Sequence, residues 1–451
     1  MKRFISHNLN EWFEKNDRKP VVLRGARQVG KTWLVRDFAK SRNLNLVEIN
    51  FERQTEYSEI FKEKSPQNIL IILERLKGFR IDKSKSLLFL DEIQKAPHIL
   101  ANLRWFYEDA AELAVIATGS LLDFVLQDHQ FSMPVGRLSY LFMEPMSFKE
   151  FLLAVGEEIL VEFIEETEIN SIVNENIHNK LMSYFIDYLT VGGMPAAVKE
   201  WTDTRSPVAV AEIHQNLVNT FIDDFNKYSG RVPTERLKKV MVAIPRMIGN
   251  KFIYTNVDRQ ENIKTTKQAL ELLISARICH RVCRSSARGL PLSAQQDEKK
   301  FKIIFMDTGL VSALMQIILK TPAEIHELIR INSGGISEQA AGQLLRTIYM
   351  KFIDPNLHYY IREARGSEAE IDYLIQAKTA IIPIEVKSGS AGSLKSLHQF
   401  MYERNFKKAV RINSEKPGLI DVDVKTSKGQ NSKYSLLSIP FYLTEEIERL
   451  V

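Results

Sequence analysis

The segment VVLRGARQVGKTWLVRDFAK, residues 21–40, decides the fold of the first third of the chain. It predicts a buried strand at 21–23, a glycine loop and a helix, and the loop fits the pattern GxxxxGK followed by Ser or Thr. Glycine lets backbone N–H groups turn toward phosphate oxygens, and the helix N-terminus adds the positive end of its dipole. Lys31 is expected to reach the β- and γ-phosphates, and Thr32 to place its hydroxyl on Mg²⁺. The residues expected to bind the nucleotide are Gly25, Ala26, Arg27, Gln28, Val29, Gly30, Lys31 and Thr32.

A pair of acidic residues follows a second buried strand. The segment KSLLFLDEIQKAP (85–97) predicts a strand at 87–90 that delivers Asp91 and Glu92 at its carboxyl end. Asp91 is expected to hold Mg²⁺ through water, and Glu92 to polarise the water that attacks the γ-phosphate. An acidic pair after an apolar run is common by itself, but downstream of a phosphate loop it indicates a nucleotide hydrolase.

Two further residues are candidates for contact with the nucleotide. A third strand, LAVIAT (113–118), is followed by Gly119 and Ser120, and Ser120 is placed to sense the γ-phosphate. Arg137 precedes another strand and can act as an arginine finger on its own or a neighbouring subunit's nucleotide. The other interpretation of Arg137 is a surface arginine held in an ion pair.

Strands near residues 21, 46, 88, 115 and 140, separated by helices, predict an α/β fold with a parallel sheet and ligands at the strand carboxyl ends. Several segments then resemble the bacterial and archaeal AAA-type ATPases that carry a conserved C-terminal domain of unknown function (DUF4143-type). These segments are RGARQVGKT (24–32), LFLDEIQ (88–94), ATGS (117–120), GRLSYLFMEPMSFKEF (136–151), LTVGGMPAAV (189–198) and FKIIFMDTGL (301–310).

The resemblance covers nearly the whole chain and implies three domains. These are a P-loop ATPase domain at 1–155, a helical and winged-helix-like middle domain at 156–325, and a domain similar to restriction endonucleases at 326–451. One segment departs from the resemblance. Residues 157–176 carry seven Glu and no Lys or Arg, and they match none of its motifs.

The middle of the chain is strongly basic. Residues 236–302 contain fifteen Lys or Arg against five Asp or Glu, a net charge of +10, whereas the whole chain has +5. Such a concentration indicates contact with a polyanion, and a solvated lysine-rich surface is the alternative. A helix at 265–275, a strand, a basic loop and a second strand at 301–307 follow the order of a winged helix. The candidate DNA contacts are Lys264, Lys267, Arg281, Arg284 and Arg288, although winged helices also serve as packing modules.

In IIPIEVKSG (381–389), Glu385 and Lys387 stand two apart on an otherwise apolar strand and therefore share one face. The question is why a carboxylate and an ammonium lie side by side on such a strand. In EAEIDYLIQ (368–376), Glu370 and Asp372 alternate with Ile371 and Tyr373. A turn at 377–379 is expected to fold the two strands together and bring Asp372 beside Glu385 and Lys387.

Two carboxylates can hold Mg²⁺, and a neighbouring lysine can orient or deprotonate a water for attack on phosphate. The three residues resemble the D…ExK site of the restriction-endonuclease-like fold. That resemblance makes Glu338, on a helix, a further acidic partner, and it places Gln399 where such nucleases often have a glutamine. It also implies a proline before the aspartate, where this chain has Ile371. A cross-strand ion pair remains the alternative for Glu385 and Lys387.

The remaining features bound the setting of the protein. Cys279 and Cys283 are the only cysteines, so a disulfide framework is excluded, and core packing is expected rather than a zinc site. The sequence has no run of about 18 uncharged apolar residues, so no membrane span is expected. A reducing cytoplasm is the expected location.

Three functions fit these patterns, all with ATP and Mg²⁺ as cofactors. The first is a DNA-directed ATPase with an attached Mg²⁺-dependent nuclease domain. The second is a non-cutting switch in which ATP binding changes how DNA or a protein partner is held. The third is a protein-directed remodelling ATPase, and in each case a homo-oligomer is compatible with the sequence.

Overall fold

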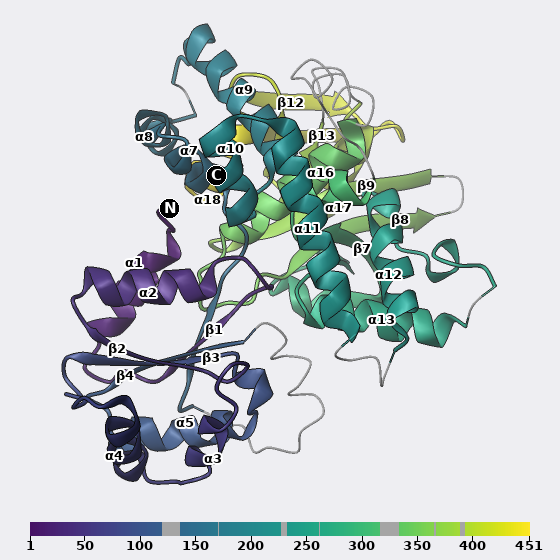
Figure 1. Cartoon of the computed structure of the whole chain (residues 1–451). Helices are drawn as coiled ribbons and strands as arrows, with labels where there is room; N and C mark the ends of the chain where they lie inside the picture. Colours follow the sequence, from purple (N-terminus) through teal and green to yellow (C-terminus); the bar gives the residue numbers. More distant parts are fainter. Residues whose placement is uncertain are drawn as a thin grey trace. The chain divides into compact units, whose positions relative to one another are not determined.

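The structure, a computed structural model, is shown in Figure 1. It describes residues 1–119, 136–169, 171–226, 232–260, 262–315, 333–364, 367–387 and 393–451. Two compact units make up the chain. The N-terminal unit consists of Met1–Glu144, Ser275–Ile278 and Met350–Asp354, and the C-terminal unit of Pro145–Ile274, Cys279–Tyr349 and Pro355–Val451. Two short segments from the second half of the sequence therefore belong to the N-terminal unit.

A five-stranded parallel sheet, in the order β2-β3-β4-β1-β5, forms the centre of the N-terminal unit. Its strands are β1 (Val21–Arg24), β2 (Asn45–Asn50), β3 (Ser86–Asp91), β4 (Ala114–Gly119) and β5 (Ser139–Phe142). Its helices are α1 (Ile5–Phe13), α2 (Lys31–Ser41), α3 (Tyr57–Ile60), α4 (Pro66–Lys77), the 3-10 turn η1 (Ile93–Lys95) and α5 (His98–Asp109). Every residue of β3 and β4 is buried, as expected for inner strands covered on both faces. The predicted α/β fold with a parallel sheet is confirmed.

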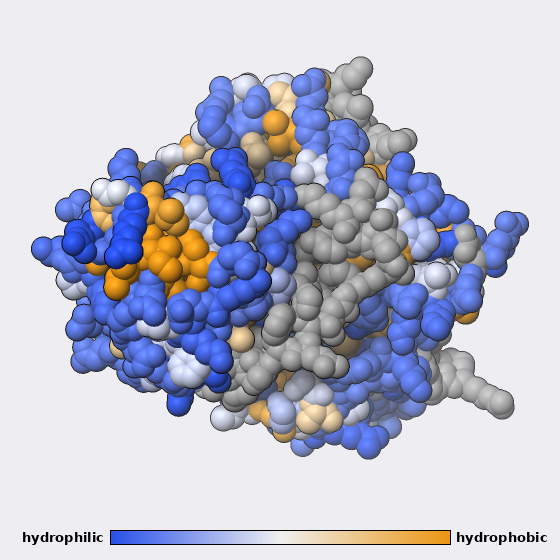
Figure 2. All heavy atoms as spheres, turned by 60° about the horizontal axis from the view of Figure 1, so that its bottom comes forward, coloured by the Kyte–Doolittle hydropathy of each residue, from blue (hydrophilic) through white to orange (hydrophobic). Residues whose placement is uncertain are grey.

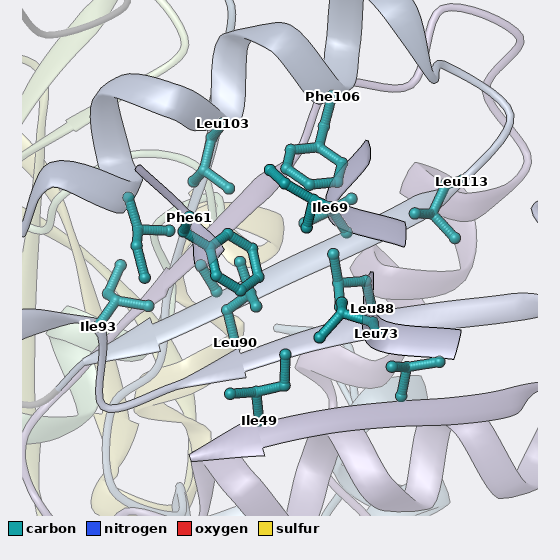
Figure 3. Packing of buried hydrophobic residues seen from close by; sticks show 14 of the residues in the cluster. Ile49, Phe61, Ile69, Leu73, Leu88, Leu90, Ile93, Leu103, Phe106 and Leu113 are labelled. Atoms are coloured by element: carbon teal, nitrogen blue, oxygen red, sulfur yellow. The ribbon is translucent and has the colours of Figure 1, made fainter. Parts of the chain in front are cut away.

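Figure 3 shows the hydrophobic core on one face of this sheet, where α4 and α5 pack over β2 and β3. Leu73 of α4, Phe106 of α5, and Leu88 and Leu90 of β3 belong to this core, and all four side chains are buried. Each such side chain stabilises the fold by about 1.5–3 kcal/mol when it leaves water. This packing fixes the direction of β3 and hence the position of the acidic residues at its end.

The outer side of α4 is also apolar. The helix and the residue two places beyond its end expose four large side chains, Ile71, Ile72, Leu76 and Phe79. Figure 2, in which the bottom of Figure 1 is turned forward, shows a compact apolar patch within a mostly hydrophilic surface. Single exposed apolar residues are ordinary, but a contiguous group is typical of a contact surface.

The C-terminal unit begins with a set of helices. They are α7 (Phe148–Ala154), α8 (Glu158–Glu166), α9 (Glu175–Val191), α10 (Pro195–Thr204), α11 (Pro207–Asn226), α12 (Thr234–Ala243) and α13 (Ile263–Ser275), with the 3-10 turns η2 (Ile244–Met247) and η3 (Tyr254–Asn256). Local capping starts several of them. Ser147 and Glu150 form a reciprocal capping box at α7, and Asn174 accepts a hydrogen bond from the Asn176 N–H at α9. Four of the seven glutamates of the acidic segment lie in α8, which buries Leu160, Val161 and Ile164.

An eight-stranded mixed sheet, in the order β12-β13-β11-β10-β9-β8-β6-β7, completes the C-terminal unit. Its strands are β6 (Cys279–Ser285), β7 (Gln296–Phe305), β8 (Leu357–Ala364), β9 (Ser367–Ala377), β10 (Ala380–Val386), β11 (Lys408–Asn413), β12 (Gly418–Lys425) and β13 (Asn431–Pro440). Helices and 3-10 turns among these strands are η4 (Leu292–Gln295), α14 (Thr308–Leu314), α16 (Ser333–Thr347), α17 (Lys395–Arg404), η5 (Phe441–Glu446) and α18 (Ile447–Leu450).

The β6–β7 hairpin is part of this large sheet. The order helix, strand, strand expected for a winged helix is present as α13, β6 and β7, and β6 pairs antiparallel with β7. However, β6 also pairs in parallel with β8. The hairpin is therefore the continuous edge of the eight-stranded sheet, with β7 as its last strand, and a winged helix is not confirmed. The sheet instead joins strands on both sides of residue 325.

Two motif segments of the C-terminal unit, LTVGGMPAAV and FKIIFMDTGL, meet at Asp307. Its carboxylate accepts hydrogen bonds from the Gly193 N–H (2.5 Å) and the Leu310 N–H (3.2 Å). Gly192 has φ 70°, and a Cβ there would lie 2.1 Å from Asp307 Oδ1. Only glycine therefore fits the turn between α9 and α10.

Helix α16 is tied to the end of β7 by amide side chains. Gln339 both accepts from the Phe305 N–H (2.8 Å) and donates to the Phe305 carbonyl (2.7 Å). Gln343 accepts from the Thr308 N–H (2.9 Å), one turn further along the helix. These contacts fix how α16 presents the neighbouring Glu338.

Across the residues that the structure describes, no helix combines the length and apolarity needed to cross a membrane.

Candidate functional site

The loop between β1 and α2 forms a tight cradle in the N-terminal unit. Gly30, at the N-cap of α2, has φ 98°, a conformation that favours glycine. A Cβ on Gly25 would lie 2.4 Å from the Met143 carbonyl oxygen. Both fixed glycines of the motif are therefore required by the backbone itself, as in loops whose N–H groups surround a bound anion.

Lys31 lies folded onto its own loop. Its Nζ donates to the carbonyl oxygens of Gly25 (2.9 Å) and Ala26 (2.7 Å). Burial, which the Glu92 and Asp91 carboxylates offset only in part, lowers the pKa of Lys31 to about 8. A phosphate oxygen would offer this ammonium a full negative charge in place of two carbonyl dipoles, so the lysine is held ready for a phosphate ligand.

Asp91 is the centre of a hydrogen-bond network at the end of β3. Its carboxylate accepts from Thr32 Oγ1 (3.2 Å), Asn50 Nδ2 (3.1 Å) and the Thr118 hydroxyl. The structure thus brings Thr32 and Asp91 together, as the motif spacing predicts. Asn50 is not among the predicted site residues, although a polar residue at the carboxyl end of β2 is a signal for it. Ser120 lies outside the described residues.

Glu92 follows directly, with φ 57°. Its carboxylate accepts a hydrogen bond from the Gln94 amide, a residue that the sequence analysis did not select. Gln94 is itself buried. A buried amide that holds a carboxylate can fix the direction in which that carboxylate meets a water molecule.

Two arginines of the N-terminal unit, the predicted Arg137 and the unpredicted Arg277, each pair with a carboxylate. Arg137 pairs with Glu108 (2.8 Å) on the surface and lies over the Tyr107 ring, as the ion-pair interpretation expects. Arg277, absent from the predicted site, belongs to the N-terminal unit and is 7% exposed at its side chain. It donates to both carboxylate oxygens of Asp354 (2.6 and 3.1 Å). No sequence pattern links these residues, which lie 77 positions apart.

A second group of charges lies in the C-terminal unit. Strands β9 and β10 pair antiparallel, as the expected turn requires, with Tyr373 opposite Ile384. Asp372 Oδ2 accepts from the Val386 N–H (2.7 Å), and Lys387 Nζ lies 2.6 Å from Glu385 Oε1. Among the described residues, the buried Glu385 Oε2 has no hydrogen-bond partner. Asp372, Glu385 and Lys387 are therefore neighbours, as predicted.

Glu338 and Glu370 join the same group through a lysine that the sequence analysis missed. Lys302 Nζ of β7 lies 2.7 Å from Glu338 Oε1 and forms a second ion pair with Glu370. The signal in the sequence was a lysine between Phe301 and Ile303, at the start of the apolar half of β7. We call these six residues the carboxylate–lysine cluster: Lys302, Glu338, Glu370, Asp372, Glu385 and Lys387.

Burial dominates the electrostatics of the carboxylate–lysine cluster. It raises the pKa of Glu338, and it raises that of Glu385 with a further contribution from the Asp372 charge. Burial alone would lower the pKa of Lys302, but the Glu338, Glu370 and Asp372 carboxylates raise it above the ordinary value. In the described part of the chain, no three His, Cys, Asp or Glu side chains are arranged to hold a metal ion. The free oxygen of Glu385 nevertheless fits an added cation.

The other predicted positions have simpler surroundings. Gln399 donates to Glu403 (2.9 Å) and more weakly to Gln430 (3.3 Å). Cys279 and Cys283 are free and buried, so core packing accounts for them.

Two of the five candidate DNA contacts are engaged by other groups of the protein. Arg281 pairs with Glu271 and lies over the Phe301 ring, while Arg284 donates to the Ile361 carbonyl (3.2 Å). The exposed candidates are Lys264, Lys267 and Arg288.

Comparison with known proteins gives matches over three segments of the chain. Family models match an AAA domain over residues 17–152, a domain of unknown function (DUF8612) over 182–321 and a domain of unknown function (DUF4143) over 333–440. No curated protein matches the sequence significantly.

Solved structures that match the chain include the Walker-type ATPase PABY2304 of Pyrococcus abyssi. It is 17% identical, with a TM-score of 0.43, and the match covers 69% of this chain and 94% of that one. The ORC2 protein of Aeropyrum pernix is 12% identical with a TM-score of 0.32, covering 73% and 93% of the two chains. A RuvB variant of Thermotoga maritima is 14% identical with a TM-score of 0.31, covering 62% and 88%. With its phosphate loop, the Thr32–Asp91 contact and the two family matches at either end, the chain is a P-loop ATPase of the AAA type that carries a C-terminal DUF4143 domain.

Proposed function

We propose that this ATPase hydrolyses ATP with Mg²⁺ at the loop after β1 and acts on DNA, with a Mg²⁺-dependent nuclease site in the carboxylate–lysine cluster. The observation that carries the ATPase half is the Thr32–Asp91 hydrogen bond of 3.2 Å beside the buried Lys31. This hydrogen bond joins the start of α2, which follows β1, to the end of β3. In phosphate-loop enzymes these two elements hold the metal ion.

The residues at this loop fit Mg²⁺–ATP. Thr32 and Asp91 would hold the ion, which neutralises the charge that develops on the phosphates. Lys31 would leave the carbonyl oxygens of Gly25 and Ala26 for phosphate oxygens. Glu92, oriented by Gln94, would accept the proton of the attacking water. Asn50 and Thr118 would keep Asp91 in place throughout.

The nuclease half of the proposal rests on Glu385. Its Oε2 has no hydrogen-bond partner among the described residues and, together with the Asp372 carboxylate, suits a divalent cation, which would polarise a phosphate oxygen. Lys387, 2.6 Å from Glu385, would orient the attacking water. DNA contact is supported by the net charge of +10 over residues 236–302 and by the exposed Lys264, Lys267 and Arg288.

The second candidate function is a non-cutting, ATP-dependent switch that holds DNA or a protein partner. The observation that favours it is the pairing of both lysines of the cluster with its carboxylates, which gives the cluster a structural role even without cleavage.

One experiment separates these functions. ATP turnover and strand cleavage are measured on the full chain with Mg²⁺, with and without DNA. DNA-stimulated turnover together with metal-dependent strand breaks supports the proposal. Stimulation without breaks supports the switch. Turnover that is indifferent to DNA would point instead to a protein-directed remodeller.

A further inference from the structure

Lys302 is a charged residue at a position where a charge is costly. Its side chain is 2% exposed, and its Nζ contacts Glu338 and Glu370 from two different elements, α16 and β9. The ring of Tyr359 lies 5.4 Å away and closes the apolar surroundings. An ammonium in such a place persists only when opposite charges and hydrogen bonds compensate for lost water.

The carboxylate–lysine cluster therefore has two unlike halves. In one half, the Lys302 ammonium forms ion pairs with Glu338 and Glu370. Glu338 is held in position because Gln339 and Gln343 fix its helix, α16. In the other half, Lys387 reaches Glu385 Oε1, but Glu385 Oε2 has no partner among the described residues. One half is complete as folded, and the other keeps a buried carboxylate oxygen whose charge a cation would compensate.

Phosphoryl-transfer sites commonly use two divalent ions about 3.5–4 Å apart, each held by carboxylates. An ammonium is compact, carries a positive charge and directs three N–H donors at surrounding oxygens. It can thus neutralise and orient two carboxylates, although it supplies one charge where a metal supplies two.

We propose that Lys302 is a built-in cation that takes the place of one of two metal ions, so that the cluster binds a single divalent ion at Asp372 and Glu385. The inference rests on the proposed metal site at those two residues. Lys302 is a positioning residue in this arrangement, and Glu338 pairs with Lys302 and does not bind the metal.

The test counts metal ions. Mn²⁺ is titrated calorimetrically into the full chain without nucleotide, and the variants are compared with the unchanged protein. The signal of the cluster is the part abolished by Asp372→Ala, which is expected to be one ion per chain. Lys302→Met removes the charge but keeps an unbranched stem, so a second ion is expected. Lys302→Arg keeps the charge and is expected to keep one ion, and Lys387→Met is the matched control from the other half, also with one ion.

Glu338→Gln gives an independent measurement if Lys302→Met does not fold. Because Glu338 is committed to Lys302, the Mn²⁺ affinity of this variant is expected to stay within about twofold of the unchanged protein. A loss of tenfold or more would make Glu338 a metal ligand and overturn the inference, as would two ions in the unchanged protein or no gain in a folded Lys302→Met. The absence of any Mn²⁺ signal sensitive to Asp372 is a different outcome, because it removes the proposed metal site itself.

Discussion

Lys31 and Glu92 have separable roles if the ATPase site works as proposed. Lys31→Ala should abolish nucleotide binding, because a buried phosphate would lose its lysine partner. Glu92→Gln should keep ATP bound but slow hydrolysis by about 10²–10⁴-fold, since proton transfer is lost while Thr32 and Asp91 remain. Fluorescent-nucleotide binding and phosphate release measure the two effects. Lys40→Ala, an exposed lysine on the same helix, is the control. Hydrolysis by Glu92→Gln at the normal rate would reject the assigned base.

His214 is the residue for which the structure predicts a pH effect. Its ring contacts the Val191 carbonyl (2.9 Å), and burial lowers its pKa from 6.5 to about 4. Between these values the unfolded chain binds the proton that the folded chain refuses, so His214 makes stability fall as pH falls from 6.5 to 4. Asp307 opposes this, because burial raises its pKa from 3.8 to about 6.

Replacement of His214 should expose that balance. His214→Gln retains a donor for Val191 but cannot be protonated. Relative to the unchanged protein, it should gain on the order of 2 kcal/mol between pH 7 and pH 4.5, because about two pKa units of penalty disappear. Urea unfolding at the two pH values measures the difference. An equal effect of the substitution at both pH values would mean that His214 takes up its proton equally in the folded and the unfolded chain, and would reject the lowered pKa.

At the scale of single elements, the sequence predicted what local patterns determine. The glycine loop, the acidic end of β3 and the β9–β10 pairing each depend on alternation or motif spacing within one short segment. The roles of Lys302 and Arg277 could not be predicted, because tertiary packing brings their partners from 36 and 77 positions away. Both also lie in a basic stretch, which favours a surface interpretation. The winged helix is not confirmed for a related reason, since no local pattern predicts that β6 also pairs with β8.

Helix α13 and the β6–β7 connection give the element-level prediction. Lys264, Lys267 and Arg288, all exposed, should be reversed to Glu together. DNA affinity should fall, and the slope of log affinity against log salt should become shallower by roughly 0.9 for each phosphate that the protein no longer neutralises. Fluorescence anisotropy across a salt series measures both quantities.

The matched control for that triple variant reverses exposed lysines of the N-terminal unit, Lys40, Lys64 and Lys85. The total charge change is the same, so a general electrostatic effect would appear in both proteins. An equal loss of affinity in the two proteins would remove α13 as the DNA-binding element and favour a protein partner.

At the scale of the whole molecule, the N-terminal unit includes pieces of sequence that its family match does not cover. Phe142 at the end of β5 donates its N–H to the Lys351 carbonyl (2.7 Å), and Arg277 pairs with Asp354. Arg277→Ala should therefore destabilise the N-terminal unit by roughly 1–3 kcal/mol, less than a fully buried pair because Asp354 is half exposed. Arg80→Ala, whose partner is Glu74 and whose side chain is 93% exposed, should change stability by about 0–1 kcal/mol. Thermal unfolding in the presence of ATP compares the two, and equal effects would show that the Arg277 pair contributes nothing special.

The interleaving of the two units also bears on how such genes can change. The chain passes between the units after residues 144, 274, 278, 349 and 354. Recombination at a single breakpoint after the phosphate loop would combine that loop from one parent with residues 275–278 and 350–354 from the other. The N-terminal unit of the product would then contain contacts between residues that did not evolve together. Lineages of this architecture are therefore expected to diversify by point substitution and surface insertion, with both ends of the gene descending together.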